Sequence, residues 1–441
     1  MKSSLTGFVL LGILFTSFSV HSQEKRTIKL DEAIDLGIKN SKQLQINAAK
    51  IEEATASLRE AEEKRLPDAN VSGAYMRILA ADFKMKSGNN GGSNNSSPKI
   101  SNAIYGILNT SVPIYAGGRI KYGIESAKYL EQAAQLDADN NKDEVIQNII
   151  EAFENLFKAK TAIRLLEENL QASKERIKDF NNMEQNGLLA RNDLLKAQLQ
   201  SSNIELNLLD AENNWQLATV HMDIMLGLPV ATELILDTTG IEKKNDTRNL
   251  QDFLQAALNN RKDIQVLDYQ KKAAQTSARS IEAEKYPNLQ LTGGYIAADI
   301  PKFISITNAV NVGLGVSYNI GSLWKTRSKV QQAEARTKQI AISEGIMNDN
   351  INMEVNNSYL NLLKNRKKIE VYAKAVEQAE ENYNIVKNKF DNSLATATDL
   401  LDADVAQFQA RLSYTLARAD AFVAYNKLLQ TAGLLSTELK K

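Results

Sequence analysis

The 441-residue chain has no cysteine, six prolines and two histidines. Without cysteine it has no disulfide, thiolate metal site, cysteine nucleophile or lipid-bearing N-terminal cysteine. Because His21 and His221 are the only histidines, a Ser-His-Asp triad and a histidine-rich metal centre are nearly excluded. The sequence therefore predicts no enzyme, no cofactor and no metal.

The chain also lacks an excess of charge of one sign. Its 53 basic and 53 acidic side chains cancel, which argues against a protein that coats nucleic acid. A mean hydropathy of -0.34 with 24% charged residues argues against a bundle of transmembrane helices. Low proline, low glycine and 6% aromatic residues favour long helices.

Residues 1–22 form a distinct segment. Lys2 precedes an apolar run over residues 8–18, and small residues flank His21. This pattern predicts a secretory signal peptide, because the run is too short to span about 30 Å of hydrocarbon. No later stretch reaches 18 apolar residues, so we expect an exported mature chain without a transmembrane helix.

The mature chain contains an internal repeat. Residues 250–295 match residues 30–75 at an offset of 220, and residues 317–434 match residues 111–228 at an offset of 206. Two ungapped blocks in the same order predict two structural repeats, residues 23–240 and residues 241–441. The extra residues of the first copy include the polar tract 86–97, which we expect to be a surface loop.

The residue pattern of each repeat predicts one helix, two strands and two long helices, in that order. The strands are expected at residues 70–80, 104–115, 289–297 and 310–320, with a small further strand within residues 232–239. In the strand expected at residues 310–320, apolar residues alternate with polar or small ones: the apolar positions are Val310, Val312, Leu314, Val316, Tyr318 and Ile320. Such a strand suits a soluble sandwich, and its length also suits a bilayer-crossing barrel. Four strands cannot close a barrel, so a barrel requires several chains, and three would give twelve strands.

The helices are expected at residues 30–65, which end before Pro67, and in two hairpins. Residues 119–185 would form a helix about 100 Å long at 1.5 Å per residue. Apolar residues recur along it at alternating steps of four and three, and the matching positions of the second repeat keep the same steps. This heptad spacing predicts coiled coils. The positions are Val145, Ile149, Ala152, Leu156, Ala159, Ile163, Leu166 and Leu170 in the first repeat, and Ile351, Val355, Ser358, Leu362, Asn365, Ile369, Tyr372 and Val376 in the second. Each hairpin returns after Gly187 or Ser393, with heptad positions Leu195, Leu199, Ser202, Leu206 and Leu401, Val405, Phe408, Leu412.

The whole mature chain resembles the TolC family of outer-membrane efflux proteins. The resemblance rests on the duplicated element order, on the strand-to-helix turn SVPIYAGGR at residues 111–119, and on the hairpin tips GLLARNDLL at 187–195 and SLATATDLLD at 393–402. It implies a mainly α chain with transmembrane β: a coiled-coil helical barrel plus four strands per chain, completing a twelve-stranded β-barrel in a homotrimer.

The resemblance also implies a location and a function. The protein would be an outer-membrane channel whose helical barrel extends into the periplasm. It would be the passive exit duct of a tripartite efflux pump or type I secretion system, working with a periplasmic adaptor and an inner-membrane transporter that supplies the energy. The alternative is an exported, non-transporting coiled-coil scaffold, in which the apolar face of residues 310–320 would not face lipid.

Site residues follow from the same resemblance. Asp399 and Asp402 would form rings of charge at a periplasmic gate, although a helix-capping role is compatible with Asp399. For Asp193 we favour the capping role. The adaptor would dock on the hairpin tips: Gly187, Leu188, Ala190, Asp193, Leu194, Leu195, Ser393, Leu394, Thr396, Leu400, Leu401.

The sequence also suggests roles for Ala395 and Trp324. Ala395 stands where some relatives place an arginine that ties the gate, so we expect closure to rest on packing and other ion pairs. Trp324 follows a predicted strand, and both a membrane-boundary anchor and simple packing suit it.

Overall fold

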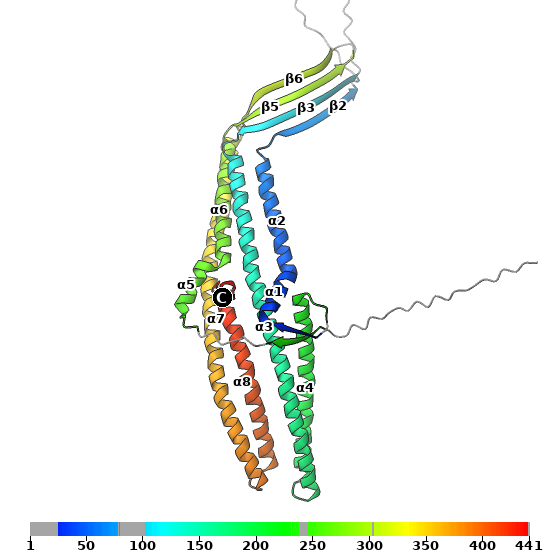
Figure 1. Ribbon diagram of the computed structural model, residues 1–441. Coiled ribbons are helices and arrows are strands. Elements are labelled where there is room, and N and C mark those ends of the chain that lie inside the picture. The colour runs from blue at the N-terminus through cyan, green and yellow to red at the C-terminus, as the bar shows by residue number, and fades with distance from the viewer. Residues whose placement is uncertain are drawn as a thin grey trace, which may run out of the picture. The chain divides into compact units, whose positions relative to one another are not determined.

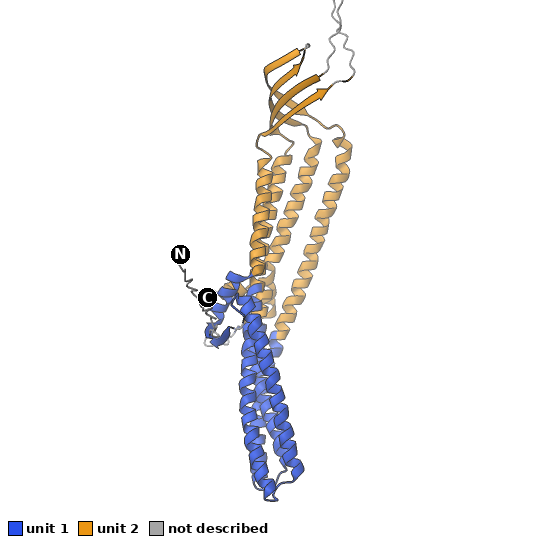
Figure 2. Ribbon diagram, turned by 90° about the vertical axis from the view of Figure 1, so that its right-hand side faces the viewer, with its two compact units in different colours: residues 1–41, 145–246, 362–424 blue, residues 42–144, 247–361, 425–441 orange. Residues whose placement is uncertain are grey.

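The computed structural model describes residues 25–77, 79, 102–230, 232–237, 246–301 and 304–439. The predicted signal peptide and the tract 86–97 lie outside these residues. No helix in the described part of the chain is long and apolar enough to cross a membrane. The chain divides into two compact units, each built from three segments (Figure 2). Unit 1 comprises residues 1–41, 145–246 and 362–424, and unit 2 comprises residues 42–144, 247–361 and 425–441.

Unit 2 contains a four-stranded antiparallel sheet in the order β2-β3-β5-β6 (Figure 1). The strands are β2 (Asp68–Arg77), β3 (Asn102–Tyr115), β5 (Asn288–Ile300) and β6 (Ile304–Ser317). All four were predicted. The last one ends at Ser317, so its predicted extent to Ile320 is wrong: Ser322 N–H and Leu323 N–H donate to the carbonyls of Asn319 and Ile320 in a turn that starts the next helix.

The register gives this sheet one apolar and one polar face. Val71, Leu108, Tyr295 and Val310 stand opposite one another across the four strands, so their side chains share a face. On β6 this face continues through Val312, Leu314 and Val316, which are 69–79% exposed. Asn70, Asn109 and Asn311 lie on the other face. β2 and β6 are edge strands with no partner in the described chain.

The predicted turn at residues 111–119 connects β3 to α3 (Arg119–Gln185). Gly117 and Gly118 have φ of 63° and 91°, a region that favours glycine. A Cβ on Gly117 would lie 2.7 Å from Tyr286 Cβ and 2.8 Å from the Ala283 carbonyl. The glycine therefore lets this turn pack against the segment that leads into β5.

Unit 2 also contains α2 (Lys42–Glu63), α5 (Leu250–Asn260), α6 (Lys262–Glu282), the 3-10 turn η1 (Ala283–Lys285) and α9 (Leu435–Glu438). The single helix predicted for residues 30–65 is wrong, because it is divided at Ser41 into α1 (Leu30–Asn40) and α2. Ser41 has extended backbone, and the Asn40 side chain donates 2.6 Å to the carbonyl of Leu226. This tertiary contact holds the end of α1 and overrides the local helix propensity.

Two helical hairpins are formed by α3 with α4 (Arg191–Leu226) and by α7 (Ser322–Asp391) with α8 (Ala397–Thr431). Unit 1 contains α4 and the parts of the other three helices nearest the turns: residues 145–185, 362–391 and 397–424. The bounds of α3 match the prediction. Its heptad positions Ile149, Leu156, Ile163 and Leu166 are buried, as the sequence predicts. On α8 the buried seam includes Ala403, Ala410, Ala417 and Ala424, at seven-residue spacing.

The predicted seam of α4 is wrong. Leu195, Leu199 and Leu206 are exposed, whereas Leu194, Ala197 and Ile204 are buried. A helix with apolar residues on two faces offers two possible seams, and the packing within the chain uses the second.

Unit 1 also holds a small parallel sheet. The expected strand within residues 232–239 is β4 (Glu233–Asp237), and it pairs with β1 (Lys25–Lys29), which the sequence did not predict. Lys25 and Lys29 form ion pairs with Glu233 and Asp237 across the two strands.

Candidate functional site at the hairpin tips

Each hairpin of unit 1 turns through one residue in the left-handed region. Gly187 has φ of 68° and Ser393 has φ of 60°. The next residue in each loop is a leucine, and its N–H donates back to a carbonyl of the preceding helix, at Met183 for Leu188 and at Lys389 for Leu394. Leu188 is 72% exposed and Leu394 is 76% exposed. The two tips therefore present the same apolar side chain to solvent.

The second tip begins α8 with a reciprocal cap. The N–H of Asp399 donates 3.1 Å to the Thr396 hydroxyl oxygen, and the N–H of Thr396 donates 2.9 Å to the Asp399 carboxylate. The Thr396 hydroxyl donates a further bond of 2.7 Å to that carboxylate. These bonds, the hydroxyl first, lower the pKa of Asp399. Asp399 thus stays ionised and exposed while it caps the helix.

Asp402 lies one turn further along α8 and is also exposed. Residues three apart on a helix share a face, so the Asp399 and Asp402 carboxylates lie on one side of α8. Within the described chain Asp402 has no ion pair, so its charge is available to solvent.

The first tip lacks this cap, and the capping role predicted for Asp193 is wrong. Ala190 precedes α4 without a side-chain hydrogen bond. The Asp193 carboxylate instead accepts from Asn192 at 3.2 Å and lies 3.5 Å from the Lys196 ammonium. Ala190 has no hydroxyl to receive the N–H of Asp193, so the cap of the second tip has no counterpart here.

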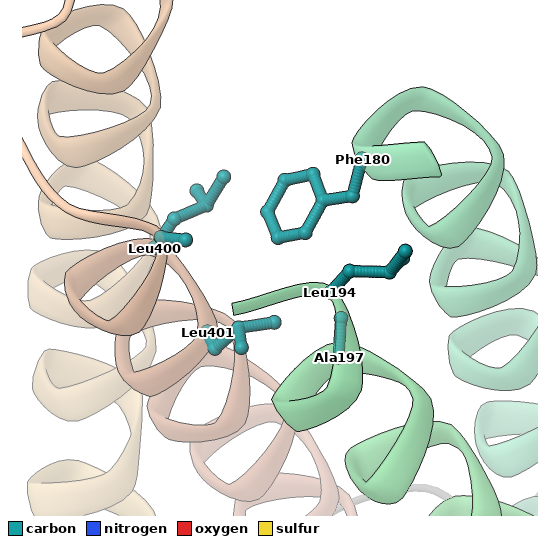
Figure 3. Packing of buried hydrophobic residues seen from close by; sticks show 6 residues of the cluster. Phe180, Leu194, Ala197, Leu400 and Leu401 are labelled. Carbon is teal, nitrogen blue, oxygen red and sulfur yellow. The ribbon is translucent and has the colours of Figure 1, made fainter. Parts of the chain in front are cut away.

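A shared apolar core joins the two hairpins near their tips. Leu194 and Ala197 of α4 pack with Leu400 and Leu401 of α8, and Phe180 of α3 completes the cluster (Figure 3). Leu194, Leu400 and Leu401 were predicted as docking residues, and all three are buried in this core. At the surface, Lys196 donates 2.9 Å to the Thr398 hydroxyl and bridges the same two helices.

One buried ion pair adds to this core. The Arg176 guanidinium donates two hydrogen bonds, of 2.7 and 2.9 Å, to Asp404, and both side chains are about one-tenth exposed, at 10% and 9%. Burial alone would lower the pKa of Arg176, but the bonds and the charge of Asp404 outweigh it and raise the pKa. Sequence reasoning missed this pair, because its members lie 228 residues apart and no local spacing connects them.

The sequence of the chain matches the family model described as "Outer membrane efflux protein" over residues 33–228 and 253–434. The chain belongs to the outer membrane efflux protein family. No curated protein matches it by sequence.

Solved structures show the same fold. The outer membrane protein VceC from Vibrio cholerae is 18% identical with a TM-score of 0.77, and the match covers 92% of this chain and 96% of that chain. The CmeC outer membrane channel of Campylobacter jejuni is 18% identical with a TM-score of 0.75, covering 93% and 88%. The open-state MtrE outer membrane channel of Neisseria gonorrhoeae is 16% identical with a TM-score of 0.72, covering 92% and 89%.

Family membership and fold together establish the class of this efflux protein. It is an outer-membrane channel with a TolC-like fold, and it serves as an exit duct of efflux. The family consists of channel proteins. The scaffold alternative is not favoured.

Proposed function

We propose that three copies of this efflux protein assemble into one duct, with a twelve-stranded β-barrel in the outer membrane and a helical barrel in the periplasm. The observation that carries this proposal is the open four-stranded sheet. Its edges β2 and β6 are unpaired in the described chain, and one face exposes Val310, Val312, Leu314 and Val316. Open edges are not tolerated in lipid, so further copies must pair with them.

The two-faced helix α4 supports the same assembly. Its exposed stripe has helical spacing and lies nearly opposite the buried seam at 100° per residue: Leu195, Leu199, Leu206, Leu209, Leu217, Ile224. A helix in a closed ring contacts one neighbour on each side. We therefore infer that this stripe, and the exposed Ile346, Met353 and Leu360 on α7, are buried between copies.

The tips support roles at the periplasmic entrance. We infer that the exposed Leu188 and Leu394, presented by Gly187 and Ser393, dock on a periplasmic adaptor. Of the other predicted docking residues, Ala190, Asp193, Leu195 and Thr396 would surround that surface. The buried Leu194, Leu400 and Leu401 would support it from the core. Asp399 and Asp402 would line the gate, where three copies would bring up to six carboxylates together. The duct would be passive and without a catalytic role, with an inner-membrane transporter supplying the energy.

We also propose that residues 23–240 and 241–441 are structural repeats. The element order supports this, because α2, β2, β3, α3 and α4 correspond to α6, β5, β6, α7 and α8. Gly227 and Gly433, which match in the sequence, both have left-handed backbone at the end of a long helix.

The experiment combines assembly and conductance. The purified full-length chain is expected to run as a trimer in mild detergent and to conduct in planar bilayers. Leu199→Glu with Leu206→Glu should abolish the trimer, because two buried carboxylates per seam oppose packing. The matched control is Asn207→Glu with Asn214→Glu, which has the same spacing on a polar face of α4 and should leave the trimer intact. A conducting monomer would refute the assembly. A trimer unaffected by the leucine changes would refute the burial of this α4 stripe between copies.

A further inference from the structure

The junction between the sheet and the helices of unit 2 carries a second exposed surface. β3 ends at Tyr115 and α3 begins at Arg119, while β6 ends at Ser317 and α7 begins at Ser322. Five large apolar or aromatic side chains are exposed here: Ile114, Tyr115, Ile320, Leu323 and Trp324, the last at 64%. The junction therefore exposes apolar and aromatic side chains next to the ends of β3 and β6.

The same junction is basic. Four cations are exposed where α3 and α7 meet the sheet: Arg119, Lys121, Lys325 and Arg327. None of them has an acidic partner among the described residues. No acidic residue occurs in residues 116–124 or 318–333. In addition, Lys285 and Lys329 neutralise Glu282 and Glu284, the acidic residues of the neighbouring junction, at 2.7 Å. The junction of α3 and α7 with the sheet therefore has a local excess of positive charge in a chain of zero net charge.

Helix stability does not explain these cations. Arg119 and Lys121 lie in the first turn of α3, and Lys325 and Arg327 lie in the first two turns of α7. The positive end of a helix dipole favours acidic residues, so each cation there is unfavourable unless an anion lies nearby. Leu323, Trp324 and Arg327 share a helix face at spacings of three and four, so the cation lies beside the apolar and aromatic surface.

We propose that this junction binds the anionic phospholipid headgroups of the membrane leaflet that faces the helices. The exposed valines of β6 would face the hydrocarbon core of the membrane. The headgroup layer next to that core is about 5–8 Å thick. Arg327 lies five residues into α7, which is about 8 Å along the helix axis. Trp324 and Tyr115 occupy the boundary that aromatic side chains prefer, and the long cationic side chains reach the phosphates.

The test uses the full-length protein in nanodiscs of phosphatidylcholine mixed with spin-labelled phosphatidylglycerol or spin-labelled phosphatidylcholine. The wild-type protein should retain the anionic lipid preferentially, and salt should weaken the preference. Lys325→Gln with Arg327→Gln should reduce it, by up to about fivefold for each cation removed. The matched control is Arg336→Gln with Lys338→Gln, which removes the same two charges at the same spacing about 16 Å further along α7. It should leave the preference unchanged.

Three outcomes are separable. An equal preference in the wild type and the Lys325/Arg327 variant would overturn the proposal. An unchanged lipid preference with an altered ion selectivity in planar bilayers would also overturn it, and would assign the cations to the channel lumen. A chain that enters neither kind of nanodisc would instead contradict the membrane channel itself, on which this inference rests.

Discussion

Arg176 of α3 and Asp404 of α8 form a bidentate ion pair that is nine-tenths buried and joins the two hairpins of unit 1 beside their shared apolar core. The Gln200 side chain of α4 approaches the same carboxylate at 3.5 Å. One charge pair therefore links three helices close to the proposed entrance.

Breaking this pair from one side should destabilise unit 1 strongly. We expect Arg176→Ala to cost about 3–5 kcal/mol, because the Asp404 carboxylate stays buried without its partner. Thermal unfolding of the detergent-solubilised protein measures the effect. The exposed pair of Arg411 with Glu380 is the control, and Arg411→Ala should cost less than about 1 kcal/mol. The double variant Arg176→Met with Asp404→Leu leaves no unpaired charge and should lose less stability. If it were as destabilised as Arg176→Ala, an unpaired charge would not explain the lost stability.

The two tips should respond oppositely to changes at matching positions. Thr396→Ala removes the reciprocal cap of α8 and should cost about 1 kcal/mol, whereas Ala190→Thr should stabilise the start of α4, because Asp193 already stands three residues on. Chemical denaturation would measure both. Thr415→Ala, within α8, is the control and should have little effect. Destabilisation by Ala190→Thr would contradict this account of the missing cap.

The acidic pair on α8 should control ion selectivity. We expect Asp399→Ala with Asp402→Ala to weaken cation selectivity and block by multivalent cations in planar bilayers. Because hydrogen bonding lowers the pKa of Asp399, its contribution to the selectivity should persist to a lower pH than that of an ordinary aspartate. Asp193→Ala changes the matching position of the first hairpin and should have the smaller effect. Selectivity unchanged by the double variant would exclude a charged gate at these residues.

Glu154 should make the stability of unit 1 depend on pH. Its side chain is only 2% exposed, and burial, opposed by Lys158 and assisted by Asp420, raises its pKa to about 7. The folded state therefore binds a proton more tightly than the unfolded state does. Stability is highest below the unfolded pKa near 4.5 and falls as the pH rises to about 7, by up to about 3 kcal/mol.

Glu154→Gln should remove this slope and stabilise the protein at pH 8, as thermal unfolding at pH 5 and pH 8 would measure. Glu168→Gln changes an exposed carboxylate on the same helix and is the control. If both variants kept the wild-type pH dependence, another group would be responsible.

Local patterns predicted much of this molecule. Period-two alternation predicted the last of the four strands, since side chains alternate between the faces of a sheet, and heptad spacing located both hairpins. The end of α3 also follows from a local signal, because Gly187 interrupts the heptad pattern. The turn at Gly117 and Gly118 was found through the family resemblance, and left-handed backbone there suits glycine. The tips were found by resemblance, and the roles proposed for their residues stay predictions.

By itself, the sequence determined the order of the four sheet strands and the long helices and the apolar face of β6, because these follow from residue spacing along single segments. Only the tertiary structure decided which stripe of α4 is buried, where the helix breaks at Ser41, and that Arg176 meets Asp404. Those features depend on which surfaces approach from distant parts of the chain. A helix with two apolar stripes has no preference between them until a partner buries one, and a charge pair 228 residues apart exists only after the hairpins have packed together.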